Sequence, residues 1–161
     1  MNRQQKAERL VQTYADDILR LSYTYLKNTT DAQDICQEVL MKRLACEKAF
    51  DSSEHEKAWI LRVTINHCKD FLKSAWQQRT CSLENCLQMA APEMPTGEIT
   101  AAVEQLPAKY RTVIYLFYFE NYSAQEIGEI MGAPTATVHT WLARGRQKLK
   151  KILGGTAYER A

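Results

Sequence analysis

Glycine and proline are absent from the first 91 residues of this 161-residue chain. The same stretch lacks the alternating β-branched residues, bounded by turns, that are typical of strands. Its apolar residues instead recur at intervals of three and four, the spacing of one helical face. These absences exclude a β-sheet from the first half of the chain and predict helices there.

No apolar run approaches the roughly 20 residues that a membrane-spanning helix needs. The N-terminal residues also lack the apolar core of a secretory signal. The composition, 45% hydrophobic and 25% charged, is typical of a soluble globular fold. We therefore expect a protein that works in the cytoplasm.

The chain has an odd number of cysteines and no C-x-x-C pair, which argues against a disulfide framework. One metal site stays open, formed by Cys81 and Cys86 with His55 or His67, but zinc sites favour more closely spaced ligand pairs. We predict no metal and no cofactor, and cysteines that serve as small apolar residues. These cysteines are Cys36, Cys46, Cys68, Cys81 and Cys86.

Motifs of enzyme active sites are missing too. The chain contains no P-loop, no paired-carboxylate site and no nucleophile triad with its supporting sequence. We therefore expect neither catalysis nor a small-molecule substrate.

Acidic residues are absent from residues 132–157, although the chain as a whole carries a net charge of only +2. Residues 98–131 have five glutamates against Lys109 and Arg111, whereas "TVHTWLARGRQKLKK" at 137–151 has five lysines and arginines. The positive charge is therefore concentrated near the end of the chain, and its position demands an explanation.

The apolar spacing predicts three helices in the first half. The first spans residues 4–27 and has Leu10, Tyr14, Ile18, Leu21 and Tyr25 on its inner side. Thr30 and Gln33 form a capping-box pattern for the second helix, whose apolar residues are Ile35, Val39, Leu40 and Leu44. The third begins near His55 and turns Ile60, Val63, His67, Phe71 and Leu72 inward.

Residues 77–97 lose this periodicity and contain two prolines and one glycine, which is typical of a linker. Beyond it we expect a short helix with Ile99, Val103 and Leu106 inside, then a continuous apolar helix in "KYRTVIYLFYFE". Ser123 with Glu126 forms a second capping-box pattern. Gly132 suits a left-handed helix end, and Pro134 suits the first turn of a last helix.

We therefore expect an all-α protein of two small helical domains, residues 1–76 and 98–155, joined by a flexible linker, 77–97. In the last helix an apolar stripe of Val138, Leu142, Gly145, Leu149 and Ile152 opposes a wide basic face. A short capped helix, a turn with glycine and a second amphipathic helix form a helix-turn-helix, whose second helix enters the major groove of DNA. The simpler alternative is a solvated charged face.

Within this helix, small hydrogen-bonding residues come first and basic residues follow. Thr137, His139 and Thr140 can approach base edges, and Arg144 can pair bidentately with guanine. The lysines suit phosphates. The full set of expected DNA contacts is Thr137, His139, Thr140, Arg144, Arg146, Gln147, Lys148 and Lys151.

The stretch "SAQEIGEIMGAPTATVHTWLARGRQKL" resembles the DNA-binding domain of LuxR-type regulators. Preceded by "LPAKYRTVIYLFYFENY", it is more similar to the second conserved domain of extracytoplasmic-function (ECF) sigma factors. "DAQDICQEVLMKRL" and "KAWILRVTINHCKDFLK" resemble the two most recognisable stretches of that family's first domain. The resemblance covers nearly the whole chain and implies a sigma factor that directs promoter-specific transcription initiation. A LuxR-like regulator that does not act as a sigma subunit is the alternative.

The resemblance implies that the helix containing "DAQDICQE" docks on core RNA polymerase. The corresponding residues are Asp31, Asp34, Gln37 and Glu38. An alternative for Asp31 and Asp34 is electrostatic stabilisation of the helix N-terminus.

The third helix resembles the part of the family that meets the minus-ten promoter element. Asn66 occupies the position of an asparagine that holds an unstacked base. Stacking and phosphate contacts suited to single strands would come from Trp59, Arg62, Lys69 and Lys73. For Trp59, packing in the core is an equal alternative.

The last helix resembles the part that reads the minus-thirty-five element of promoter DNA. Ala136, His139 and Trp141 depart from the residues common in the family, so the promoter sequence does not follow from the resemblance. Membership also implies an anti-sigma factor, often membrane-anchored, that covers the polymerase-binding surfaces.

Overall fold

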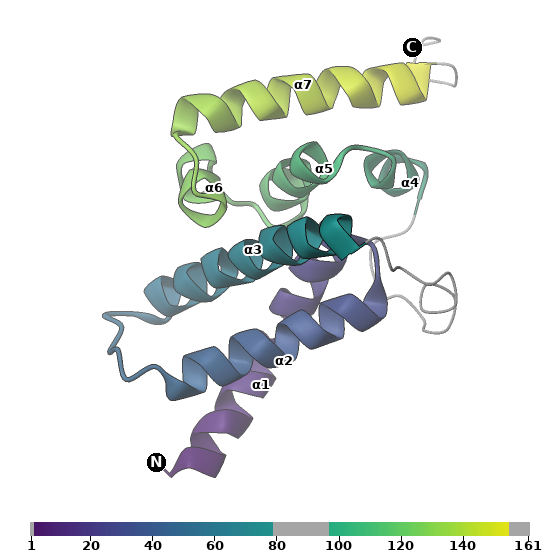
Figure 1. Ribbon diagram of the computed structural model, residues 1–161. Helices are drawn as coiled ribbons and strands as arrows, with labels where there is room; N and C mark the ends of the chain where they lie inside the picture. The colour runs from purple at the N-terminus through teal and green to yellow at the C-terminus, as the bar shows by residue number, and fades with distance from the viewer. Residues whose placement is uncertain (1, 79–96, 155–161) are drawn as a thin grey trace. The chain divides into compact units, whose positions relative to one another are not determined.

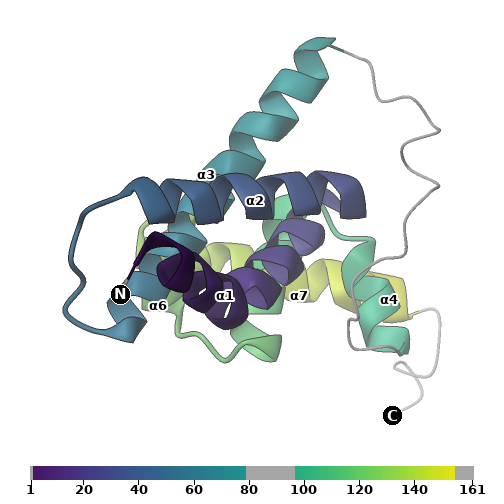
Figure 2. The same cartoon turned by 90° about the horizontal axis from the view of Figure 1, so that it is seen from below.

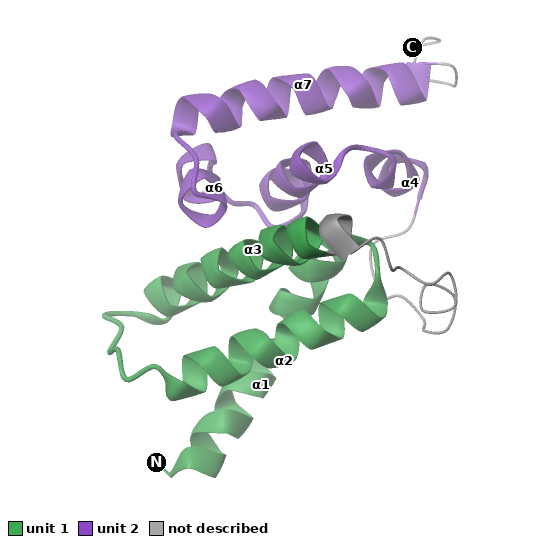
Figure 3. Ribbon diagram, viewed as in Figure 1, with its two compact units in different colours: residues 1–92 green, residues 93–161 purple. Residues whose placement is uncertain are grey.

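A computed structural model of the chain describes residues 2–78 and 97–154, with side chains as far as residue 74 in the first range. All regular elements within these ranges are helical, which confirms the all-α fold for the described part of the chain. The chain divides into two compact units, residues 1–92 and 93–161 (Figure 3). Of the expected linker only the ends are described: Gln77 and Gln78 close one helix, and Gly97 precedes the next.

Unit 1 contains three helices that pack on one another, α1 (Arg3–Leu26), α2 (Thr29–Ala45) and α3 (Ser53–Gln78) (Figure 1). The C-terminal part of α3 projects beyond α1 and α2 (Figure 2). The core draws on all three helices and consists of Leu10, Tyr14, Ile18, Ile35, Cys36, Val39, Ile60, Val63 and Cys68. Leu72 was predicted to face inward but is 38% exposed, so that prediction is wrong.

The helices of unit 1 begin within two residues of the predicted positions, but the cap of α2 differs from the predicted one. The Asn28 side chain caps α2 by accepting a hydrogen bond from the amide of Asp31 at 2.9 Å. The predicted capping box of Thr30 and Gln33 is therefore wrong, because a better capping side chain stands two residues earlier. The third helix begins at Ser53, and the Ser52 hydroxyl accepts from the amide of His55 at 3.2 Å.

Unit 2 packs three short helices against a long one. α4 (Glu98–Glu104), α5 (Ala108–Ile114) and α6 (Ala124–Met131) all contact α7 (Thr135–Gly154) (Figure 1). Val103 and Leu106 are buried as predicted, but Ile99 is 61% exposed. The prediction for Ile99 is wrong because the inner side of this seven-residue helix is formed by Ala102 and Val103 in its second turn.

The apolar segment after Pro107 is not one continuous α-helix. α5 ends at Ile114, and a five-residue π-helical turn, η1 (Tyr115–Phe119), follows it. The amide of Glu120 donates to the carbonyl of Tyr115 at 3.2 Å, the wide spacing that defines such a turn. Asn121 then adopts a left-handed backbone with φ of 60°, which helps the chain turn toward α6.

Candidate nucleic-acid interface

The helix-turn-helix of unit 2 forms as its sequence predicts. The Ser123 hydroxyl accepts from the amide of Glu126 at 3.1 Å, and the Glu126 carboxylate accepts from the amide of Ser123 at 3.0 Å, which confirms the capping box of α6. Gly132 ends α6 with φ of 69°, the left-handed conformation expected of it. Pro134 lies just before α7 rather than in its first turn, and its carbonyl accepts from the amide of Val138.

Two glycines allow close approach around α7. A Cβ at Gly128 would lie 2.6 Å from the carbonyl oxygen of Ala133, so the turn between α6 and α7 requires glycine there. A Cβ at Gly145 would lie 3.1 Å from Cγ1 of Ile114, which allows α5 to pack directly on α7. With Val138 and Leu142 also buried, the predicted seam holds α7 against unit 2 and leaves its opposite face outside.

Most of the expected DNA contacts lie on that outer face. Thr137 is partly buried, and the Thr140 hydroxyl donates to the carbonyl of Ala136 in its own helix at 3.2 Å. The exposed members of the set are His139, Thr140, Arg144, Arg146, Gln147, Lys148 and Lys151. The arrangement is a basic helical surface without a carboxylate.

Arg146 and Lys148 lie on the two flanks of α7, where aromatic rings hold them. Nε of Arg146 donates to the Tyr118 hydroxyl at 2.6 Å, and its guanidinium lies 5.6 Å from that ring centroid and 5.8 Å from the ring of Phe117. Nζ of Lys148 lies 5.6 Å from the ring of Tyr110. These aromatic partners are distant along the chain, and no sequence pattern predicted them.

The predicted minus-ten residues on α3 share one exposed stripe. Arg62, Asn66, Lys69 and Lys73 follow one another at intervals of four, three and four, and all are exposed. One helical side therefore offers three cations and one amide to a ligand.

Trp59 begins this stripe but packs inward. Its side chain is partly buried and packs against the core of unit 1, with its ring 5.8 Å from the ring of Phe50. Phe50 in turn lies under the guanidinium of Arg43, at 4.7 Å. Of the two alternatives for Trp59, this geometry favours core packing over stacking on a base.

The residues of α2 expected to bind polymerase differ in their exposure. Asp31 is partly buried, and burial together with the neighbouring Asp34 carboxylate raises the pKa of Asp31. Asp34, Gln37 and Glu38 are exposed. Glu38 also pairs across to α3, with Oε2 3.2 Å from Nδ1 of His67, so this carboxylate already has a partner within unit 1.

A shallow apolar groove of about 200 Å³ runs between α1 and α2 beside Gln37. Val11 is 50% exposed and Met41 62% exposed at this groove, which is unusual for large apolar side chains. The complete lining is Ala7, Leu10, Val11, Gln37, Leu40, Met41 and Leu44. The sequence patterns predicted no role for Val11 or Met41.

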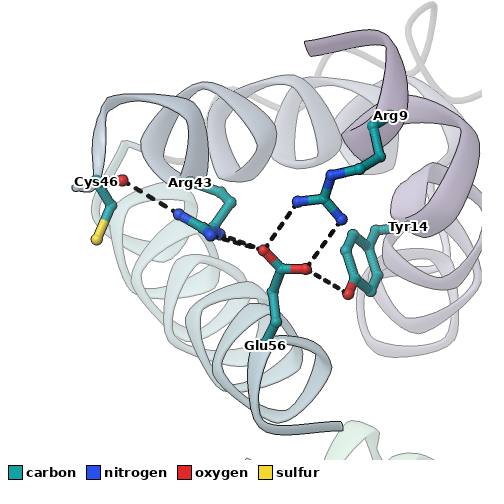
Figure 4. A network of polar contacts seen from close by, with 5 residues as sticks. All are labelled: Arg9, Tyr14, Arg43, Cys46 and Glu56. Atoms are coloured by element: carbon teal, nitrogen blue, oxygen red, sulfur yellow. Dashed lines mark hydrogen bonds and ion pairs between the residues drawn. The ribbon is translucent and has the colours of Figure 1, made fainter. Parts of the chain in front are cut away.

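A buried carboxylate joins the three helices of unit 1 (Figure 4). Glu56 accepts from the Tyr14 hydroxyl at 2.6 Å, from Nε of Arg43 at 2.8 Å and from Arg9 at 3.2 and 3.3 Å. Arg43 also donates to the carbonyl of Cys46 at 3.1 Å. Burial alone would raise the pKa of Glu56, but the three hydrogen-bonding side chains outweigh it and lower the pKa to about 2.

Within the described residues, no three His, Cys, Asp or Glu side chains gather as a metal site. Cys81 and Cys86 of the alternative metal site lie outside these residues. Cys36 and Cys68 are buried, and burial raises the pKa of their thiols to about 11 and about 12. No helix in the described ranges has the length and apolar character to cross a membrane.

Comparison with known proteins gives matches along the chain. The family described as sigma-70 region 2 matches residues 10–78, and that described as sigma-70, region 4 matches residues 96–149. The ECF RNA polymerase sigma factor SigW of Bacillus subtilis is 34% identical over 89% of this chain and 87% of its own length. SigV of the same organism, an RNA polymerase sigma factor, is 30% identical over 85% and 84%.

A solved structure shares the fold. The sigma factor RpoE from Bartonella quintana, in co-crystals with the anti-sigma factor NepR, superposes with a TM-score of 0.71 at 18% identity. The match covers 91% of this chain and 96% of that one. LuxR-type regulators, the alternative from the sequence, are not supported by these matches.

Proposed function

The chain belongs to the ECF sigma factors of the sigma-70 family, and from this premise we propose that it binds core RNA polymerase and directs promoter-specific initiation. The observation that carries the proposal is the match of both sigma-70 regions, in chain order, over most of the chain. Sigma factors are initiation factors rather than enzymes, and we assign no catalytic residue, cofactor or small-molecule substrate.

Polymerase would bind the outer face of α2. Asp34, Gln37 and Glu38 are exposed there, and the apolar groove with Met41 and Val11 adjoins them. An interface that combines desolvated apolar side chains with charges at its rim is typical of specific protein association. Asp31, partly buried with a raised pKa, would act from the edge of this face.

The upstream promoter element would lie against α7. In the first half of the helix, the residues that would contact base edges are Thr137, His139, Thr140 and Arg144. The second half would add contacts from Arg146, Gln147, Lys148 and Lys151. Arg144 is exposed on the side opposite Val138 and Leu142, so its guanidinium can reach a guanine. Lys151 lies two turns farther on and suits a phosphate.

The downstream element, where the strands separate, would lie against α3. Asn66 would hold an unstacked base, and Arg62, Lys69 and Lys73 would contact the backbone of the single strand. The Trp59 side chain packs against Phe50 and the core of unit 1, so it does not stack on a base.

We assign the cytoplasm as the site of action, where core polymerase and promoter DNA are found. An anti-sigma factor is the expected regulatory partner, as in the complex of RpoE with NepR. It would cover the α2 face and the adjoining groove and so compete with polymerase.

The test is run-off transcription by core polymerase on DNA from upstream of the protein's own gene. Transcripts should start at a fixed position only when the chain is added, and the chain should co-purify with core polymerase. A regulator that is not a sigma subunit would bind the same DNA yet give no transcript with core polymerase alone. That outcome would reject the sigma assignment.

A further inference from the structure

One flank of α7 carries two lysines and two aromatic rings from separate helices. Nζ of Lys109 on α5 lies 5.1 Å from the ring centroid of Tyr110 and 5.3 Å from that of Trp141 on α7. Nζ of Lys148, also on α7, lies 5.6 Å from the same Tyr110 ring. All three distances fall within the range of cation–π attraction.

The packing of α5 on α7 fixes this group. Gly145 lies between Trp141 and Lys148 on the helix, and a Cβ built on it would be only 3.6 Å from Cβ of Tyr110. Tyr110 therefore lies one turn from each of these two side chains. The partly buried Trp141 and Tyr110 form a platform at the edge of the exposed face.

The two lysines at the platform have no acidic partner among the described residues. Lys109 and Lys148 are both exposed, and neither forms an ion pair with any residue that the structure describes. Two ammonium groups at one ring repel each other, and an anion between or beside them would relieve that repulsion. A cation restrained by a ring also loses less side-chain freedom when it binds.

The position of the platform indicates which anion it meets. Trp141 is one helical turn from both Thr137 and Arg144, which belong to the proposed base-reading face. Arg146, held by Tyr118, lies on the opposite flank. A helix in the major groove has a phosphate backbone on each side, so the two flanks are placed to contact one backbone each.

We propose that Lys109 contacts a backbone phosphate of duplex DNA and that Trp141 is the positioning residue that holds it there. No role was predicted for Lys109, because it lies in the acidic segment before the helix-turn-helix. This inference rests on the proposed function, in that α7 must bind duplex DNA. It adds α5 to the DNA-binding surface.

The experiment measures DNA binding by the full chain over a range of salt concentrations, on a duplex with its preferred upstream sequence and on a scrambled duplex. Lys109→Gln should lower the salt slope by about one unit and reduce affinity by the same factor on both duplexes, as loss of one phosphate contact predicts. Lys48→Gln is the matched control. Lys48 is an exposed lysine of unit 1 that also lies by a ring, 5.6 Å from Phe50, and its loss should leave the slope unchanged.

The role of Trp141 is tested by a double-mutant cycle. In a Trp141→Leu background, Lys109→Gln should change the salt slope much less than in the wild type, whereas Trp141→Phe should restore most of the effect. Additive effects would mean that Trp141 does not position Lys109, and would overturn that part of the proposal.

An unchanged salt slope for Lys109→Gln would overturn the phosphate contact, provided that the wild type binds and Arg144→Ala alters its preference. A wild-type chain that binds neither duplex would instead count against the proposed function itself. Circular dichroism of each variant separates loss of binding from loss of fold.

Discussion

The cations of the two units have different kinds of partners. In unit 1, Arg9 and Arg43 both pair with a single buried carboxylate, Glu56, so that each cation has an anionic partner within the unit. In unit 2, Lys109, Arg146 and Lys148 lie against aromatic rings at the surface, and none of them pairs with a carboxylate of the described residues. The Glu56 network of unit 1 connects helices, whereas the cations beside aromatic rings in unit 2 leave a positive potential at the surface that attracts an anion.

This comparison predicts different results for charge removal in the two units. Removing the carboxylate from the unit 1 network should lower stability, because the buried Arg43 then remains without its ionic partner. Removing one from the α7 surface should leave stability nearly unchanged and weaken DNA binding.

The largest effect is expected for Glu56→Gln, which leaves Arg9 and Arg43 without a counter-charge. We expect the free energy of unfolding to fall by about 3–5 kcal/mol, as when one partner of a buried ion pair is removed. Urea unfolding followed by circular dichroism, with amide exchange in α1 to α3, measures it. Glu54→Gln, an exposed glutamate of the same helix turn, is the control, and an equally small loss for both variants would contradict the role of the network.

The difference in unfolding free energy between the wild type and Glu56→Gln should disappear at low pH. The pKa of Glu56 is lowered from 4.5 to about 2, so its ionised form is favoured by the folded state. The stabilisation is complete above pH 4.5, where the carboxylate is ionised in both states, and is lost as the pH falls toward 2. Unfolding free energies at pH 7, 5, 4 and 3 should therefore converge for wild type and Glu56→Gln. A difference that stays constant to pH 3 would show that the carboxylate is not the stabilising form.

Charge reversal on the outer face of α2 should act on binding and not on the fold. Asp34→Lys with Glu38→Lys should weaken core polymerase binding by about 100-fold, since like charges brought together across an interface cost several kcal/mol. Competition binding to core polymerase measures this, and circular dichroism should stay helical. His67→Gln is a useful companion, because it removes the partner of Glu38 without changing the outer charges. Unchanged affinity after the double reversal would remove α2 from the interface.

A smaller effect is expected for Arg144→Ala on α7. It should cost about 1–3 kcal/mol on the preferred upstream sequence and relax the preference at one base pair, since a bidentate guanine contact is lost. Lys151→Ala is the comparison: it should weaken all sequences alike and lower the salt slope by about one unit. Salt-titrated binding to variant promoters measures both. If Arg144→Ala lost affinity equally on every sequence, Arg144 would be a phosphate contact.

Features that depend on near neighbours could be predicted from the sequence. The capping box of Ser123 and Glu126, the left-handed Gly132 and the buried stripe of Val138 and Leu142 all follow from spacings of three or four residues. The exposed face of α7 follows from the same periodicity, because a helix that buries one side exposes the other. One local prediction was wrong: the capping box expected at Thr30 does not form, because Asn28 caps α2 instead.

The sequence by itself therefore determined two sets of helices, the buried side of each long helix and the positive face of α7. Only the tertiary structure decided which side chains meet: Glu56 with Arg9, 47 residues away, and Arg146 with Tyr118, 28 residues away. It also turned Trp59 toward Phe50 and placed Lys109 by Trp141. Helix periodicity determines the direction in which a side chain points around the helix axis. The partner that it contacts depends on how separate helices pack, and the local spacing of residues does not determine that packing.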